Sequence, residues 1–185
     1  MKTTLLLSLA ACFFNTLKAE EAKTPVPPEL QALAKSLLNA IQAQDNAAIS
    51  ACWHAPETLA KRKVAEEQAK TVLNNKEINT EKEADKERKR REKDMEYTLH
   101  RIGQIRTLAT KIAGDPAQLK LTELELDTDS EATEAEPAYD DVELHLAAAD
   151  GTEITFEIDD AIKIEGTWKF KGRVEDRFSI ELTDP

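Results

Sequence analysis

Residues 142–182 read VELHLAAADGTEITFEIDDAIKIEGTWKFKGRVEDRFSIEL and decide the fold. Through most of this stretch, even-numbered positions are apolar and the intervening positions are mostly polar. The apolar set is Val142, Leu144, Leu146, Ile154, Phe156, Ile158, Ile162, Ile164, Trp168, Phe170, Phe178 and Ile180. Because successive side chains of a strand point to opposite faces, a period of two predicts strands with one apolar face. Turn signals at Asp150-Gly151, Glu165-Gly166 and Gly172 divide the stretch into an antiparallel meander.

A first strand is expected just before this meander. Leu119 and Leu121 alternate with polar residues, and so do Leu124 and Leu126, but the phase slips by one near Thr122-Glu123. A β-bulge at the slip would bend the strand, as a curved sheet requires.

The chain upstream of the sheet predicts helices. From Glu29 to about Gln44, apolar residues recur three and four positions apart, which is the spacing of an amphipathic helix. Asp45-Asn46 would cap a second, short helix that ends near Trp53. A sheet with one apolar face must lay that face on another layer, so these helices are expected to cover it.

Two longer helices are expected next. Residues 57–73 form the first, and Thr80 to Glu83 has the sequence of a capping box that would start the second. Residues 76–96 contain eight basic and eight acidic residues, which predicts a solvated face. An apolar stripe then runs from 95 to 112, so the second helix should be half embedded and half projecting.

The basic run at residues 88–91 has two interpretations. It is either a docking site for an acidic partner or a solvated helical face that neighbouring acidic residues neutralise, and the second interpretation is preferred.

The N-terminus has the pattern of an export signal. Residues 1–19 combine a short basic start with a ten-residue apolar run, which is too short to span a bilayer. Cleavage after Ala19 would release a proline-rich tether at residues 20–28. The alternative is lipidation of Cys12, since LAAC at residues 9–12 resembles a bacterial lipobox. The chain is therefore expected to be periplasmic or secreted, or else a membrane-anchored lipoprotein.

The remainder, residues 29–185, has the length of a single domain, with a helical part at 29–113 and an antiparallel sheet at 117–183. The predicted fold class is α+β, with N-terminal helices and a long charged helical hairpin packed on a curved sheet of four to six strands.

Two stretches carry a resemblance to a known family. Residues 30–53, LQALAKSLLNAIQAQDNAAISACW, resemble the opening helices of the nuclear transport factor 2-like, or cystatin-like, α+β superfamily. Residues 142–172 resemble the closing strands of its secreted members. The resemblance implies that the helices fill the concave face of the sheet and leave a conical pocket. The family includes isomerases, dehydratases and non-catalytic binding domains.

Aromatic residues are the candidates for lining such a pocket, although aromatic residues at these spacings are more often core. The candidates are Trp53, Tyr97, Phe156, Trp168 and Phe170. They would bind a small apolar ligand.

Catalytic and metal-binding patterns are missing from the sequence. His54, His100 and His145 fall in three different predicted elements and at none of the familiar metal spacings. Cys52 lies in a mostly apolar helical stretch, which favours a buried structural thiol over a nucleophile. No catalytic residue, metal or cofactor is predicted.

The net charge of the chain limits the classes of partner that are expected. The net charge is −11, and residues 114–185 contain 21 acidic but only 6 basic residues. Nucleic acid is not an expected partner, because phosphate binding needs clustered lysine and arginine, and the membrane is expected only through a lipid on Cys12. The preferred function is an exported, non-catalytic binding or protein-interaction domain, and a homo-oligomer is compatible with it. The alternatives are an acid–base enzyme of isomerase or dehydratase type, and a structural envelope protein.

Overall fold

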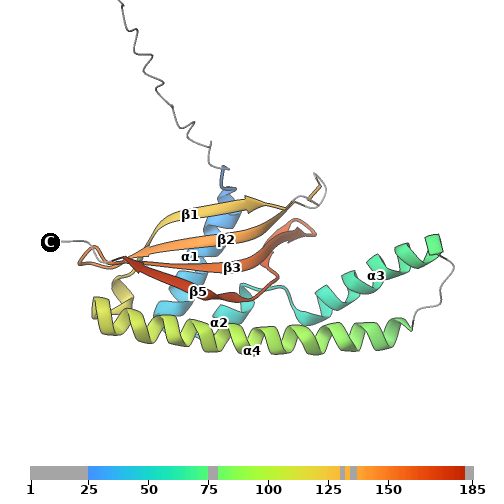
Figure 1. The fold of residues 1–185 in the computed structure, drawn as a ribbon, viewed down its shortest axis with the longest axis horizontal. Coiled ribbons are helices and arrows are strands. Elements are labelled where there is room, and N and C mark those ends of the chain that lie inside the picture. The colour runs from blue at the N-terminus through green and yellow to red at the C-terminus, as the bar shows by residue number, and fades with distance from the viewer. Residues whose placement is uncertain (1–24, 75–78, 130–131, 134–136, 182–185) are drawn as a thin grey trace, which may run out of the picture.

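The computed structural model describes residues 25–74, 79–129, 132–133 and 137–181. Within these residues, four helices precede a five-stranded antiparallel sheet (Figure 1). The helices are α1 (Pro28–Ala43), α2 (Asn46–Ala51), α3 (Pro56–Asn74) and α4 (Thr80–Ala113), followed by a 3-10 turn, η1 (Pro116–Gln118). The strands are β1 (Lys120–Thr128), β2 (Ala138–Ala147), β3 (Glu153–Ile164), β4 (Thr167–Phe170) and β5 (Val174–Glu181). The predicted α+β fold class is confirmed.

The expected export signal at residues 1–19, the lipid site at Cys12 and most of the tether at 20–28 lie outside the described residues. In the described ranges, no helix has both the length and the apolar character that a membrane crossing requires.

The sheet is built around β3. β2 lies on one side of β3, and β4 and β5 share the other side, β4 beside its end and β5 beside its start. β1 forms the opposite edge, where it pairs with β2 alone among the described strands. The register of β1 against β2 shifts between Leu121 and Glu123, so the predicted bulge is confirmed.

The even-numbered face of the sheet forms the core with α1. In Figure 1, α1 lies behind the sheet and crosses it, and α1 contacts both β1 and β4. Leu30, Leu37 and Ile41 of α1 are fully buried, as are the side chains at even positions of β2 and β3 from Val142 to Ile158. Burying one aliphatic side chain of this size contributes about 1.5–3 kcal/mol, so this layer contact is the main source of stability.

The edge strand β5 departs from the even-position pattern. Phe178 remains 36% exposed, although its even number predicts burial. The cause is position, since β5 meets α4 instead of lying over α1. The Arg101 guanidinium partly covers the aromatic ring, with its central carbon 5.4 Å from the ring centroid of Phe178.

α4 covers the outer edge of β5 with hydrogen bonds. The buried Thr98 hydroxyl accepts a hydrogen bond from the backbone N–H of Val174 at 3.2 Å. The Arg101 guanidinium donates to the carbonyl oxygens of Glu175 and Asp176. These bonds satisfy backbone groups that an edge strand otherwise leaves unpaired.

α3 and the first half of α4 form a hairpin that extends beyond the sheet (Figure 1), which we call the arm. A 34-residue helix is about 50 Å long, so α4 reaches both the sheet edge and the arm. The half-embedded, half-projecting helix expected from the sequence is therefore present. At the base of the arm, Arg91 donates to buried Glu87 at 2.7 Å and to the Lys171 carbonyl oxygen at 3.1 Å.

The N-cap of α4 differs from the prediction. Asn79, not Thr80, is the N-cap, and its side-chain oxygen accepts a hydrogen bond from the Lys82 N–H at 3.0 Å. A cap residue needs extended backbone angles, which Asn79 has, whereas Thr80 is already helical. The predicted cap of α2 is confirmed, since the Asp45 carboxylate accepts from the N–H groups of Ala47 and Ala48.

Candidate functional site

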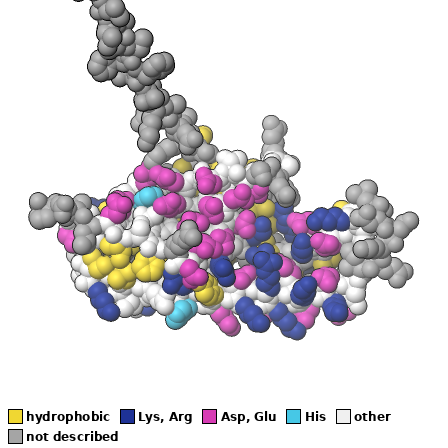
Figure 2. Space-filling model, in the orientation of Figure 1, with side chains coloured by type: hydrophobic (Ala, Val, Ile, Leu, Met, Phe, Trp, Pro, Cys, Tyr) yellow, Lys and Arg dark blue, Asp and Glu magenta, His cyan; other side chains and the backbone are white. Residues whose placement is uncertain are grey.

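The odd-numbered face of the sheet is acidic, and no helix or strand of the described residues covers it. In Figure 2, Asp and Glu side chains gather over the face of the sheet that lies opposite α1. Six carboxylates from three neighbouring strands form what we call the carboxylate face: Glu125, Asp127, Asp141, Glu143, Glu157 and Asp159.

The strand register places these like charges opposite one another. Glu143 of β2 is paired with Glu125 on one side and Glu157 on the other. In the adjoining row, Asp141 stands between Asp127 and Asp159. Like charges directly opposite one another destabilise a sheet, so this arrangement carries a cost in folding free energy.

The strongest electrostatic effect is at Asp159. Its pKa is raised to about 7, first by burial and then by a hydrogen bond to Glu175 and by the negative charge of Glu175. The charge of Asp141 acts in the same direction, and Arg173 opposes it. The pKa of Glu157 is also raised, by burial and then by Asp141. Asp159 therefore keeps its proton to a much higher pH than an ordinary aspartate does.

His145 is the basic group at the far end of this face. Its Nδ1 lies 3.3 Å from a Glu153 carboxylate oxygen and 3.2 Å from the Thr155 hydroxyl, and its Nε2 lies 3.6 Å from Glu143. His145 is at an odd position of β2, so it lies on the face opposite the core.

Two groups on this face have ligand atoms within 4.8 Å of one another. One is Glu125, Glu143 and His145, and the other is Asp141, Glu157 and Asp159. A divalent cation could bridge either group, but exposed acidic residues often reach this spacing without an ion. The spacing alone does not define a metal centre.

Four of the five aromatic residues proposed for a ligand pocket fill the core instead. Trp53, Phe156, Trp168 and Phe170 are all at least 94% buried and belong to the main hydrophobic cluster. The rings of Trp53 and Phe170 are in contact, with centroids 5.0 Å apart. The Trp53 indole also donates to the Gly172 carbonyl oxygen at 2.6 Å.

The fifth residue, Tyr97, lies on a different surface. It projects from α4 toward β5, where its hydroxyl donates to the Asp176 carboxylate. The Arg173 guanidinium lies over its ring, 5.2 Å from the centroid. The structure therefore does not bring Tyr97 together with the other four.

Cys52 and His54 are also structural. Cys52 is buried, and its burial raises the pKa of the thiol, as expected for an inert cysteine. The His54 N–H donates to the Phe170 carbonyl oxygen, and the Phe170 N–H donates to the Cys52 carbonyl oxygen, so residues 52–54 run beside β4. These bonds join the helical part to the sheet.

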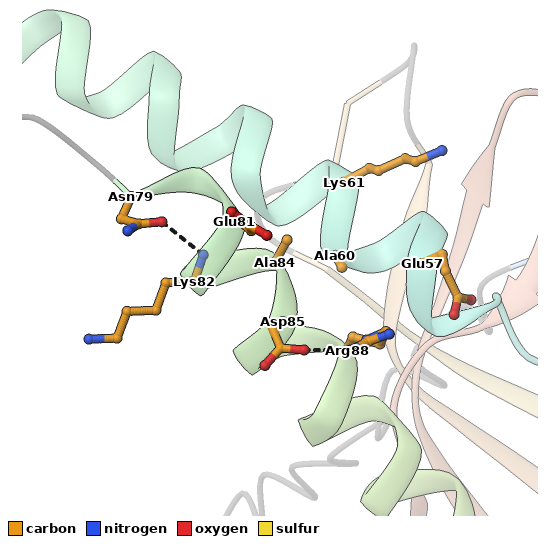
Figure 3. A pocket seen from close by; sticks show the side chains of 9 residues that line it. All are labelled: Glu57, Ala60, Lys61, Asn79, Glu81, Lys82, Ala84, Asp85 and Arg88. Carbon is orange, nitrogen blue, oxygen red and sulfur yellow. Dashed lines mark hydrogen bonds and ion pairs between the residues drawn. The ribbon is translucent and has the colours of Figure 1, made fainter.

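The arm has a cleft on each side. The outer cleft has a volume of about 560 Å³ and a floor that includes Ala60 of α3 and Ala84 of α4 (Figure 3). Charged residues line its rim, including Lys61 and Arg88. The inner cleft, of about 420 Å³, lies between the arm and the sheet.

The sequence analysis missed the carboxylate face as a unit. The signal was available, because acidic residues recur at odd positions in each of the three strands. What it lacked was the register, which decides whether carboxylates of neighbouring strands stand opposite one another or alternate with other groups.

Comparisons with family models, curated proteins and solved structures found no match to this chain. The resemblance to the nuclear transport factor 2-like superfamily stays a prediction.

Proposed function

We propose that this chain is an exported, non-catalytic interaction domain that presents its carboxylate face to a basic protein partner. The observation that carries the proposal is the alignment of six carboxylates on a face of the sheet that no described helix covers. Clustered charge of one sign attracts and orients an oppositely charged partner before contact.

Solubility alone is a weaker explanation of this face. A net charge of −11 keeps a domain of this size soluble wherever the acidic residues lie. Here they stand opposite one another, and the charge of Asp141 adds to burial in raising the pKa values of Glu157 and Asp159. A surface that keeps such repulsion is better explained by a partner whose positive charge relieves it.

The test is titration with a lysine-rich peptide at low and moderate salt. The face variant is Asp141→Asn/Glu143→Gln/Glu157→Gln. We expect it to bind the peptide at least about tenfold more weakly than the wild type, because three attractive charges are lost at the contact. Binding by the wild type should weaken steeply with salt, since the charges are near the surface.

A matched control separates the face from the net charge. Glu81→Gln/Glu92→Gln/Glu96→Gln removes the same number of charges from exposed positions of α4. The control should bind the peptide almost as well as the wild type. Equal weakening in both variants would show that only net charge matters, and the proposal would fail.

Export is tested by the mass of the chain purified from its own host. Cleavage after Ala19 gives a chain that starts at Glu20, whereas a lipoprotein starts at a lipid-bearing Cys12. A chain that retains all of residues 1–19 would contradict export by either route.

One observation favours the acid–base enzyme as a second candidate. Asp159, with a pKa of about 7, has the protonation behaviour of a general acid or base and contacts a second carboxyl, Glu175. Neither residue lines the outer or the inner cleft. A dehydration or isomerisation activity of the purified chain that is lost in Asp159→Asn would favour the enzyme over the interaction domain.

A further inference from the structure

The inner cleft brings together segments that are far apart in the sequence. α3 forms one wall and α4 another. Asp129, Ala132 and Thr133 of the β1–β2 connection, the ends of β2 and β3, and Lys171 close the remaining side. Its volume of about 420 Å³ is within the range of small-molecule sites. Convergence of several elements on one concavity is typical of such sites.

The lining combines an apolar floor with a cationic rim. Leu59, Ala138 and Ile162 are each more than 90% buried and form the apolar part. Among the described residues that line the cleft, three are acidic and six are basic: Arg62, Lys63, Lys70, Arg90, Arg91 and Lys171. Basic residues thus outnumber acidic ones within the lining itself, although Lys171 also pairs with Asp160, outside the lining, at 3.3 Å.

The acidic member at the base of the cleft is already neutralised. Glu87 is 8% exposed and accepts a hydrogen bond from Arg91 at 2.7 Å. The same arginine donates to the Lys171 carbonyl oxygen, so its guanidinium is fixed in place. Because Glu87 is paired in this way, its carboxylate repels an anion at the base of the cleft less strongly.

Two further cations are oriented loosely enough to meet a ligand. The Arg90 guanidinium lies 3.8 Å from Glu87 and 3.9 Å from Asp94, beyond hydrogen-bond distance. The Lys63 ammonium pairs with Glu67 at 3.1 Å on an exposed part of α3. Exposed pairs of this kind are weak and are readily exchanged for a better partner.

His54 lies next to the cleft and is influenced by one of its cations, Arg62. Its Nε2 lies 3.1 Å from the carbonyl oxygen of Ile162, a residue of the cleft floor. Burial lowers the pKa of His54, the hydrogen bond to Ile162 raises it, and the positive charges of Lys169, outside the cleft lining, and Arg62, within it, lower it. An anion in the cleft would oppose those charges and raise this pKa.

We propose that the inner cleft binds a small organic carboxylate with an aliphatic tail, with the oxyanion at the cationic rim and the tail on the apolar floor. The cleft lies on the arm side of the molecule and does not include the carboxylate face. The proposal therefore goes beyond the interaction function and stands or fails separately from it.

The experiment is calorimetric titration of the full chain with sodium octanoate. Acetate tests the need for a tail, and octylammonium tests the sign of the charge. We expect saturable binding of octanoate and at least about tenfold weaker binding of both other probes, because each lacks one of the two interactions.

Two double variants on the same two helices locate the site. Lys63→Gln/Arg90→Gln removes one charge from α3 and one from α4 inside the inner cleft, and Lys61→Gln/Arg88→Gln does the same in the outer cleft. All four side chains are at the surface of the arm, so both variants should fold. We expect the inner variant to bind octanoate about tenfold more weakly and the outer variant to bind it like the wild type.

The His54 ring supplies an independent readout by NMR. Saturating octanoate should raise the pKa of His54 in the wild type, and less so in the inner variant. Failure of octanoate to saturate, equal binding of octylammonium, or equal loss in the two double variants would each overturn the proposal.

Discussion

Gly172 lies where two backbone segments come into direct contact. A Cβ placed on this glycine would be 2.2 Å from the Cβ of Asp159 and 2.3 Å from its carbonyl oxygen. The Gly172 N–H donates to that same carbonyl at 2.9 Å, so the contact holds the start of β5 against β3. We expect Gly172→Ala to lower the free energy of unfolding by about 3 kcal/mol, measured by urea denaturation, because rigid backbone must move.

Gly103 is the matched control. It lies inside α4, and a Cβ there would meet no atom within 4 Å. Gly103→Ala should raise the free energy of unfolding by up to about 1 kcal/mol, since alanine is the better helix former. A loss below about 1 kcal/mol in Gly172→Ala would contradict the close contact.

Asp159 makes stability depend on pH. Its pKa is about 7 in the folded chain and near 3.8 ordinarily, so the folded state binds the proton more tightly. The stabilisation from this group is complete below about pH 4 and is lost as the pH rises to about 7. The loss should be on the order of 2 kcal/mol, which discounts the full shift for screening by solvent.

Asp159→Asn tests this dependence because asparagine does not titrate. Between about pH 4 and pH 7.5, the midpoint temperature of thermal unfolding should fall less for the variant than for the wild type. Glu175, Asp141 and Arg173 face Asp159 and remain in both proteins. Parallel profiles for the two proteins would show that Asp159 does not hold the extra proton.

At the scale of the element, the start of α4 tests which residue caps it. Asn79→Ala removes the side-chain acceptor for the Lys82 N–H and should lower the free energy of opening of the first turn by about 1 kcal/mol. Thr80→Ala should have little effect, although the sequence predicts a capping box there. Native-state hydrogen exchange of the first turn measures both effects. A larger effect of Thr80→Ala than of Asn79→Ala would support the predicted capping box instead.

The helices and strands themselves were largely predictable, because apolar residues recur in them at regular spacings. The alternation from Val142 to Phe170 predicts the strands, and the phase slip near Thr122 predicts the bulge. The exposure of Phe178 was not predictable, since it depends on which layer covers β5. Periodicity gives the face of a strand but not what lies on that face.

At the scale of the whole molecule, the sheet and the arm should differ in local stability. The described buried apolar residues gather between α1 and the sheet, whereas α3 contributes Leu59 and Ala60 near the base of the arm. Few buried contacts predict easy local opening. We expect amides of residues 82–90 to exchange at least about tenfold faster than those of 100–108, measured by hydrogen exchange. Equal protection along α4 would mean that the helix opens as one unit.

The candidate site was less predictable than the fold. The five aromatic residues were chosen because large rings could line a pocket. Four of them fill the core instead, because aromatic rings on the inner faces of packed helices and strands are usually buried. The carboxylate face and the inner cleft depend on strand register and on where the arm folds back. Neither property is a local feature of sequence, so both required the structure.

Because α4 covers the outer edge of β5 and residues 52–54 run beside β4, β1 is the edge of the described sheet that has no such cover. Two copies that joined through this edge would use the same surface twice, and antiparallel pairing of identical edges has two-fold symmetry. A two-fold contact is complete with two copies. Growth into a fibre needs two different free edges, and α4 removes the second.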